Sequence, residues 1–490
     1  MKTETTIRVL QSTIGNPAAR ALLKKMSAYC EKDGKNRVEV AIELYTGQRD
    51  TACLGCRMAE KVVAGVLRRG ATAFGVDEAR LKDTFSNGYW AKGLASTVRG
   101  IAEFGVRKPF TPGAPFQVVW DVTTDCNLNC RHCYATAGTR GVDELNTAEA
   151  KQAIDAFARA GVTILAFSGG EPLVRDDIFE LTSHAASKGL YVAIATNGTL
   201  ITDEVAARMK RNGVEFLQIS LDGISAETHD AFRGVDGAFD RTVKGIKNAV
   251  SHDFFVEIST TVTSHNYQEL SDIIDFSEEL GADWFMAYNF VPTGRGSDIA
   301  ETDLSPWQRE EMLRMLWQEL KSERDINVLS TAPQFARVAL QQEGDADEKT
   351  VPTHFYNPTL GGRLADLAEF IGGCGAGRFY MAMKANGDLQ PCVFFPLKVG
   401  NIREDDFEEI WKNDEVLRQL RDRDELQACS DCEYRYYCGG CRARAYGYTG
   451  DYLAADPGCI NNQEAYRRVV EQPPGPSATM EQPIFSLRCG

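Results

Sequence analysis

The sequence lacks the features that mark membrane, secreted and nucleic-acid-binding proteins. It contains no run of about 18 apolar residues that would make a membrane-spanning helix. Its first residues carry no apolar segment of the kind found in secretory signal peptides, so we expect a cytoplasmic protein without a transmembrane segment. No long basic run is present and the net charge is −15, which argues against a nucleic acid backbone or an anionic membrane surface as the main partner.

The chain is long and rich in cysteine. Its 490 residues, of which 43% are hydrophobic, suffice for about three ordinary domains with buried cores. The fourteen cysteines do not suit a disulfide framework, because disulfides are rare in the reducing cytosol. Metal ligation is the better interpretation. Three lie at 30–56, a tight trio lies at 126–133, seven more lie at 374–459, and Cys489 stands apart. The trio and the seven predict two metal regions.

From residue 116 onward, short β-branched or aromatic runs alternate with longer amphipathic segments. This alternation is typical of consecutive strand and helix units, with parallel strands and outer helices. The six expected strands are Phe116–Val122, Val162–Phe167, Tyr191–Ala195, Phe216–Leu221, Phe254–Thr261 and Trp284–Phe290. We predict an α/β fold with a partial six-stranded β/α barrel, in which the chemistry lies at the carboxyl ends of the strands.

The first cysteine motif, CxxxCxxC, follows the first of these strands. Its thiols, Cys126, Cys130 and Cys133, can hold three irons of a [4Fe-4S] cluster and leave the fourth iron with an open site. Such a site suits a chelating substrate or cofactor. The motif resembles that of the radical S-adenosylmethionine (SAM) superfamily, in which the amino and carboxylate groups of SAM chelate this iron.

The resemblance implies the chemistry of that superfamily. A reduced cluster passes an electron to the SAM sulfonium, the C5′–S bond breaks, and the resulting 5′-deoxyadenosyl radical abstracts hydrogen from a substrate. The three thiols at 126, 130 and 133 are then the catalytic residues. A reducing partner such as ferredoxin or flavodoxin is expected to supply the electron.

Motifs at the ends of the next three strands are similar to family positions that contact SAM. Ser168–Pro172 matches the family's GGEP motif, whose glycines allow close backbone approach and whose glutamate offers a counter-charge to the SAM ammonium. The expected SAM contacts are Gly169, Gly170, Glu171, Asn197, Ser220, Asp222 and Arg233. For Asn197, Ser220 and Asp222 the alternative is a structural role, because polar residues at strand ends often cap the next helix.

The second cysteine region resembles the SPASM domain, an auxiliary-cluster extension that follows many radical SAM barrels. The resemblance implies one [4Fe-4S] cluster on Cys429, Cys432, Cys438 and Cys459 and another on Cys374, Cys392 and Cys441. The chain departs from the family in two ways. Two residues instead of three separate Cys438 from Cys441, and no cysteine lies between Cys374 and Cys392, so the second set is one ligand short. This segment lacks an aliphatic core, so its folding is expected to depend on metal.

The expected domains follow these motifs. They are a helical N-terminal domain (1–110), the radical SAM barrel (111–340), a linker (341–369), the SPASM domain (370–465) and a flexible tail (466–490). Within the first domain, helical patterns cover Ala18–Tyr29, Met58–Arg68 and Trp90–Phe104, and one alternating run, Val38–Leu44, is typical of a strand.

Two features of the N-terminal domain have open roles. Cys53 and Cys56, with Cys30 nearby in the sequence, supply another metal site, the missing auxiliary ligand, or simply buried structural cysteines. The helix that carries Trp90 and Lys92 either gathers a carboxylated or lipid-like substrate or is plain core with solvated lysines.

The substrate class follows from a local resemblance. Residues 441–446, 449–451 and 456–457 are similar to heme-biosynthesis and quinone-cofactor members of the SPASM group, which favours maturation of a cofactor, a tetrapyrrole or another small molecule. A peptide- or protein-modifying maturase is the alternative. Two other classes stay open, a non-catalytic iron–sulfur electron carrier and a zinc-binding scaffold; a carrier would leave SAM intact and a scaffold would contain zinc instead of iron.

Overall fold

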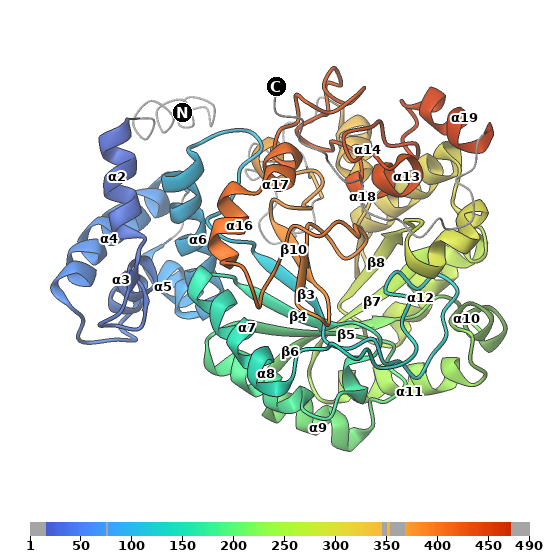
Figure 1. Cartoon of the computed structure of the whole chain (residues 1–490), viewed down its shortest axis with the longest axis horizontal. Helices are drawn as coiled ribbons and strands as arrows, with labels where there is room; N and C mark the ends of the chain where they lie inside the picture. The colour runs from blue at the N-terminus through green and yellow to red at the C-terminus, as the bar shows by residue number, and fades with distance from the viewer. Residues whose placement is uncertain (1–15, 75–76, 345–349, 353–367, 472–490) are drawn as a thin grey trace, which may run out of the picture.

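A single ten-stranded sheet organises the molecule (Figure 1). The structure, a computed structural model, describes residues 16–74, 77–344, 350–352 and 368–471. Seven neighbouring strands are parallel and follow chain order: β3 (Gln117–Asp121), β4 (Ile164–Ser168), β5 (Tyr191–Thr196), β6 (Val214–Ser220), β7 (Phe255–Val262), β8 (Trp284–Asn289) and β9 (Asn327–Ser330). The sheet stays open at both edges, which confirms the predicted partial barrel. The six expected strands are present, and β9 is an addition.

Helices cover the outer face of this curved sheet (Figure 1). They are α7 (Thr147–Ala160), α8 (Ile178–Ser187), α9 (Asp203–Arg211), α10 (Ala226–Arg233), α11 (Ala238–Ser251), α12 (Leu270–Glu279), α13 (Pro306–Lys321) and α14 (Gln334–Glu343). The sequence sets α7 clearly, because Asn146 and Glu149 form a capping box at its start and Gly161 ends it in the left-handed conformation. One large apolar core fills the space between helices and strands.

The N-terminal helices form a separate group beside the barrel (Figure 1). They are α2 (Pro17–Met26), α3 (Arg37–Thr46), α4 (Leu54–Phe74), α5 (Glu78–Ser86) and α6 (Gly88–Phe104), with a short hairpin of β1 (Tyr29–Cys30) and β2 (Lys35–Asn36). The three expected helices are confirmed as α2, α4 and α6. This group has its own small apolar core.

The strand expected at Val38–Leu44 is wrong, because these residues lie in α3. Asn36 caps this helix by accepting a hydrogen bond from the backbone N–H of Val38, and Gly47 ends it with φ +83°. These capping signals outweigh the short alternating run. The buried side chains recur at helical spacing, at Val38, Ala41, Ile42 and Tyr45.

The cysteine-rich region extends the barrel sheet. Its strand β10 (Tyr380–Met383) pairs in parallel with β3, and β11 (Asp388–Gln390) and β12 (Gly400–Asn401) follow as antiparallel neighbours. Its helices are α15 (Ala368–Ile371), α16 (Phe407–Asn413), α17 (Glu415–Leu420), α18 (Arg442–Thr449) and α19 (Gln463–Glu471). The expected linker lies largely, and the expected tail mostly, outside the described residues.

Candidate active site

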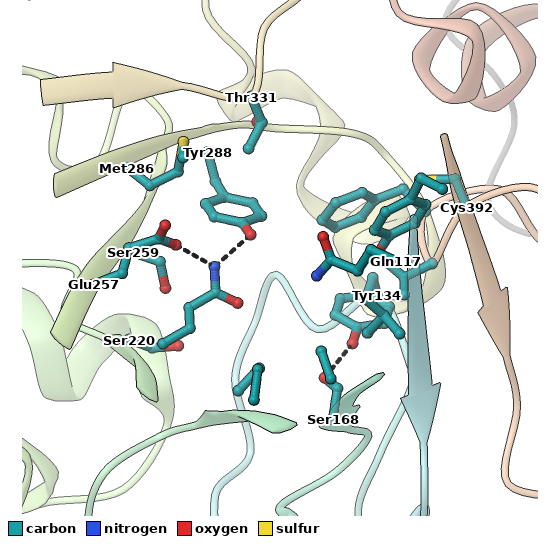
Figure 2. Close-up of a pocket in the computed structure, with 18 of the residues that line it drawn as sticks. Gln117, Tyr134, Ser168, Ser220, Glu257, Ser259, Met286, Tyr288, Thr331 and Cys392 are labelled. Carbon is teal, nitrogen blue, oxygen red and sulfur yellow. Dashed lines mark hydrogen bonds between the residues drawn. The ribbon is translucent and has the colours of Figure 1, made fainter. Parts of the chain in front are cut away.

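A cavity of about 540 Å³ lies inside the curved sheet (Figure 2). Its lining includes three cysteines from each of the two regions, which are Cys126, Cys130, Cys133, Cys374, Cys392 and Cys441. Helix α6 contributes Tyr89 and Trp90 to the lining of the same cavity. The volume is in the range of small-molecule sites.

The two groups of cysteines line opposite ends of the strands. Cys126, Cys130 and Cys133 occupy the loop after the carboxyl end of β3. Strand β11 runs antiparallel to β10, so it returns the chain to the level where β10 and β3 begin, and Cys392 follows there. In Figure 2, Cys392 accordingly lies near Gln117 at the start of β3, far from Ser168 at the end of β4.

The surroundings of the first thiol group fit an iron–sulfur cluster. The backbone N–H of Leu128 donates to Cys126 Sγ at 3.4 Å, and Cys133 Sγ accepts another backbone N–H at 3.4 Å. The guanidinium Nη1 of Arg233 lies 3.8 Å from Cys130 Sγ. Donors directed at sulfur stabilise thiolate ligands and tune the reduction potential of a cluster.

Burial controls the protonation of Cys126. It raises the pKa of Cys126 to about 12, and the negative charge of Glu171 adds to the shift. Without metal the thiol is therefore protonated at neutral pH, and cluster binding releases protons. The neighbouring GGEP loop packs tightly against the cysteine loop, since a Cβ at Gly170 would clash with the backbone carbonyl of Asp125.

A buried ion pair sits beside the trio. Arg233 Nη2 lies 2.5 Å from Asp222 Oδ2. Although burial opposes its charge, Asp222 and Cys130 keep the pKa of Arg233 above its ordinary value. His132 stacks on Phe232 with ring centroids 4.1 Å apart, and burial lowers its pKa well below the ordinary value. Arg233 therefore carries a fixed positive charge here, whereas His132 is neutral.

Glu171 lies behind the cavity wall. It is fully buried, and its carboxylate accepts hydrogen bonds from the Thr196 hydroxyl and the Asn197 backbone N–H, both at 2.8 Å. In this position it ties the GGEP loop to the end of β5. Of the expected SAM contacts, the structure brings five to the cavity lining, Gly169, Gly170, Asn197, Ser220 and Arg233; Glu171 and Asp222 are not among the lining residues.

The auxiliary cysteines at the cavity lie close enough to interact electrostatically. Burial raises the pKa of Cys392, and the charges of Cys374 and Cys441 add to the shift. Burial also raises the pKa of Cys441 to about 12, again with a contribution from Cys374. These three thiols therefore form one group, at the same end of the cavity.

The other auxiliary cysteines lie outside the cavity lining. Burial raises the pKa of Cys438, and Cys459 and Cys429 add to it. Arg423 is buried beside these thiols and donates to the carbonyl oxygen of Cys374 at 2.7 Å. Within the described chain, Nε and Nη1 of Arg423 have no hydrogen-bond partner. An anionic cluster on these thiols fits such a buried cation.

Comparisons with known proteins agree with this arrangement. Residues 120–277 match the Radical SAM superfamily, and residues 374–433 match SPASM, an iron–sulfur cluster-binding domain. An AdoMet-dependent heme synthase of Methanosarcina barkeri is 42% identical over 71% of this chain and 97% of its own. The chain belongs to the radical SAM superfamily. It is therefore an enzyme that uses SAM and iron–sulfur clusters.

The matches also include a protein named as a maturase and a structure solved with a precursor peptide. The mycofactocin maturase MftC of Mycobacterium ulcerans is 34% identical over 72% of this chain and 89% of its own. The solved structure of SuiB from Streptococcus suis, bound to the precursor peptide SuiA, shares the fold with a TM-score of 0.60 at 18% identity, over 87% of this chain and 95% of that one. No helix in the described part of this radical SAM enzyme is both long and apolar enough to span a bilayer.

The middle of the cavity wall carries polar residues that the sequence analysis missed. Gln218 Nε2 lies 2.6 Å from Glu257 Oε1 and 2.5 Å from Tyr288 Oη (Figure 2). Burial raises the pKa of Glu257 to about 7, and the hydrogen bond from Gln218 offsets only part of this shift. A carboxyl group that titrates near neutral pH is typical of functional sites. In the sequence, the available indication was a lone acidic residue inside the buried strand β7.

Tyr134 lies between the two groups of thiols. Its hydroxyl donates to Asp121 Oδ1 at 3.0 Å and is 3.0 Å from Ser168 Oγ. Its ring meets Phe394 edge-on, with centroids 5.1 Å apart, and packs in one apolar cluster with Cys392. The residue directly after Cys133 therefore reaches the auxiliary side of the cavity.

The structure shows where the two N-terminal features with open roles lie. Trp90 lines the cavity, whereas the Lys92 ammonium is buried 3.6 Å from the Glu39 carboxylate and is not part of the lining. Lys92 is therefore neither a substrate contact nor a solvated lysine. Cys30, Cys53 and Cys56 also lie outside the cavity lining and gather with Asp33.

Proposed function

We propose that this radical SAM enzyme matures a small cofactor and that its substrate is a tetrapyrrole with carboxylate side chains. The observation that carries the proposal is the single cavity lined by both groups of three cysteines. A molecule in this cavity lies between the two, so one centre can act on it from each side. The extent of the match to the heme synthase, 97% of that enzyme's length, supports the substrate class.

The proposed metal ligands follow the two cysteine regions. Cys126, Cys130 and Cys133 hold the SAM-cleaving cluster, Cys374, Cys392 and Cys441 hold the first auxiliary cluster, and Cys429, Cys432, Cys438 and Cys459 hold the second. With clusters and SAM bound, the site supplies reductive cleavage of SAM to a 5′-deoxyadenosyl radical and an auxiliary redox centre. A reduced ferredoxin or flavodoxin in the cytoplasm is the proposed electron donor.

The residues around the trio are proposed to orient SAM. Gly169 and Gly170 let the backbone approach it, and Asn197 and Ser220 offer polar contacts from the cavity wall. Arg233 carries its charge at the cavity lining and is the proposed partner of the SAM carboxylate. Glu171 and Asp222 act through their neighbours, by fixing Asn197 and Arg233.

The remaining wall suits a flat molecule with a large apolar face and polar groups at its edge. Aromatic side chains line it near the strand starts, among them Trp90, Phe216 and Phe255. Glu257 and Gln218 are polar groups in this wall. Below pH 7 the neutral Glu257 carboxyl can donate a hydrogen bond to a substrate carboxylate, while ring faces pack on the macrocycle.

An anaerobic turnover assay tests the proposal. Reconstituted and reduced protein is given SAM and either an iron porphyrin with propionate side chains or a synthetic precursor peptide. Consumption of the porphyrin together with 5′-deoxyadenosine formation, measured by liquid chromatography and mass spectrometry, is the expected result. A peptide-modifying maturase is the second candidate, favoured by the match to MftC. Modification of the peptide with the porphyrin left intact would establish that candidate instead.

A further inference from the structure

Four side chains of the N-terminal region converge on one point, away from the cavity. Cys30, Asp33, Cys53 and Cys56 each offer a ligand atom, and these atoms all lie within 4.8 Å of one another. Cys30 Sγ is 3.6 Å from Cys53 Sγ and 3.3 Å from Asp33 Oδ2. Neither matched family region, 120–277 or 374–433, includes these residues.

Two short turns build this cluster. Cys30 precedes the turn between β1 and β2, and Asp33 lies in it next to Gly34, which has φ +70° and donates its N–H to the Cys30 carbonyl at 2.8 Å. Cys53 precedes α4, and Cys56 lies in its first turn. The Cys53 backbone N–H donates to the Asp33 carboxylate at 3.2 Å and so joins the two turns. Each turn supplies ligands at i and i+3, the spacing typical of zinc knuckles.

The size of the ring selects a single ion. A tetrahedral Zn²⁺ with Zn–S bonds of about 2.3 Å places two sulfur ligands about 3.7 Å apart, close to the 3.6 Å between Cys30 and Cys53. A [4Fe-4S] cluster requires wider spacing, because each thiolate binds a different iron. Three thiolates and one carboxylate complete a tetrahedron and leave no open position.

The surroundings balance the charge of such a site. Three thiolates and a carboxylate exceed the charge of Zn²⁺ by two, and two arginines lie nearby. Arg49 Nη1 is 3.8 Å from Asp33 Oδ1. Arg37 Nε and Cys53 Sγ lie against the same side of Gly55, and this buried Nε has no hydrogen-bond partner in the described chain. Cys56 is fully buried and Cys30 is 4% exposed, whereas Asp33 and Cys53 are partly exposed, so two of the four ligands are shielded from water.

We propose that Cys30, Asp33, Cys53 and Cys56 bind one Zn²⁺ ion in a closed structural site. The ion joins the β1–β2 hairpin to the start of α4 and so stabilises the small N-terminal core. Helix α6 belongs to the same core and carries Tyr89 and Trp90 into the cavity wall. The zinc site therefore supports one wall of the substrate cavity without contacting substrate.

Metal analysis of the full chain tests the proposal. Zinc, iron and sulfide are measured by mass spectrometry and colorimetry on the anaerobically reconstituted protein and on the Cys53→Ser/Cys56→Ser variant. We expect about one zinc per chain in the parent and about none in the variant, with iron and sulfide unchanged. A parent without zinc, a variant that keeps it, or iron bound at these residues instead overturns the proposal.

Two more conservative variants control for misfolding of the double variant. Asp33→Asn keeps the size of the side chain but removes the anionic ligand, so zinc should pass faster to a colorimetric chelator. Glu43→Gln is the matched control, because Glu43 pairs with Lys35 and Arg49 beside the site but offers it no ligand; its zinc release should equal that of the parent. Equal release from all three proteins contradicts the assignment. These readouts do not depend on the tetrapyrrole substrate.

Discussion

The two cysteine regions of this enzyme are held in opposite ways. The trio lies within one loop of eight residues, 126–133, after the end of β3, and packs in a small apolar cluster with Leu128 and Ala238. The auxiliary cysteines are spread over residues 374–459 and are surrounded by buried arginines, among them Arg378, Arg423, Arg442 and Arg444. The first region rests on a scaffold that folds through hydrophobic burial. The second region contributes to the apolar core of the barrel through β10, β11, α16 and α17, but its buried arginines also require anions, so we expect its folding to depend on its metal as well.

Replacing the trio tests the first half of this comparison and should have the largest effect on activity. We expect Cys126→Ala/Cys130→Ala/Cys133→Ala to abolish 5′-deoxyadenosine formation, because no thiolate is left to hold the SAM-cleaving cluster. The barrel core does not depend on this loop, so the variant should stay folded and keep its auxiliary iron. Product analysis and iron and sulfide assays measure both outcomes. Complete loss of iron would show that the auxiliary ligands are misassigned.

Single auxiliary cysteines should separate the two metal sites of the second region. Cys392 lines the cavity and Cys432 does not. Cys392→Ala should lower substrate turnover by about 100-fold or more, since even residues that only support metal ligands contribute about 10- to 100-fold. SAM cleavage uncoupled from substrate should continue. Cys432→Ala is the matched comparison, with a smaller loss of turnover and a similar loss of iron; equal losses of turnover would argue against a role for the cavity-facing site.

The buried ion pair between Arg444 and Asp456 should show how strongly the second region depends on charge. Both side chains are fully buried, with Arg444 Nε 2.8 Å from Asp456 Oδ1, and Asp456 also accepts the Cys441 backbone N–H at 2.7 Å. Asp456→Asn should lower the free energy of unfolding by about 3–5 kcal/mol, because it leaves a buried guanidinium uncompensated. Chemical denaturation of the metal-loaded protein measures this.

The same pair predicts a pH dependence. Burial alone would raise the pKa of Asp456, but Arg444 and the hydrogen bonds hold it well below its ordinary value. Its contribution to stability is therefore complete at neutral pH and is lost only as the pH falls below the ordinary aspartate pKa of about 3.9. A double variant, Arg444→Met with Asp456→Leu, should recover part of the lost stability. No recovery would show that the hydrogen bonds of Asp456, and not its charge, dominate.

The contrast between the regions also explains what the sequence could predict. The six barrel strands and the trio depend on patterns a few residues long, and all are found where expected. The four-residue β9 carries too little pattern to identify, and the pairing of β10 with β3 joins segments about 260 residues apart. That pairing brings Cys392 to the strand starts, so the geometry of the auxiliary site was not readable from spacing. The convergence of Asp33 with three cysteines was likewise not predictable from spacing, because it depends on the turn at Gly34.

Glu257 lies between the two cysteine regions, and its replacement should have the smallest effect on activity. It projects from a barrel strand into the cavity, so it belongs to the rigid side of the enzyme (Figure 2). Glu257→Gln keeps the size of the side chain and a hydrogen-bond donor. We expect kcat/KM to fall by about tenfold or less, the range expected when one hydrogen bond is weakened. Ser259→Ala, a change on the same strand and in the same wall, is the control for altered cavity shape.

The decisive readout for Glu257 is the pH profile. Burial raises its pKa to about 7, above the ordinary glutamate value of about 4.3. The neutral form that donates to a substrate carboxylate therefore prevails below pH 7, and KM should rise as the pH increases through 7. The stability contributed by the neutral carboxyl is complete below the ordinary glutamate pKa of about 4.3 and is lost as the pH rises to about 7. In Glu257→Gln the side chain cannot ionise, so both dependences should flatten, whereas Ser259→Ala should keep them. A parent profile without an inflection near pH 7 would show that Glu257 does not contact an ionised substrate group, and that the polar part of the cavity wall acts on a neutral molecule instead.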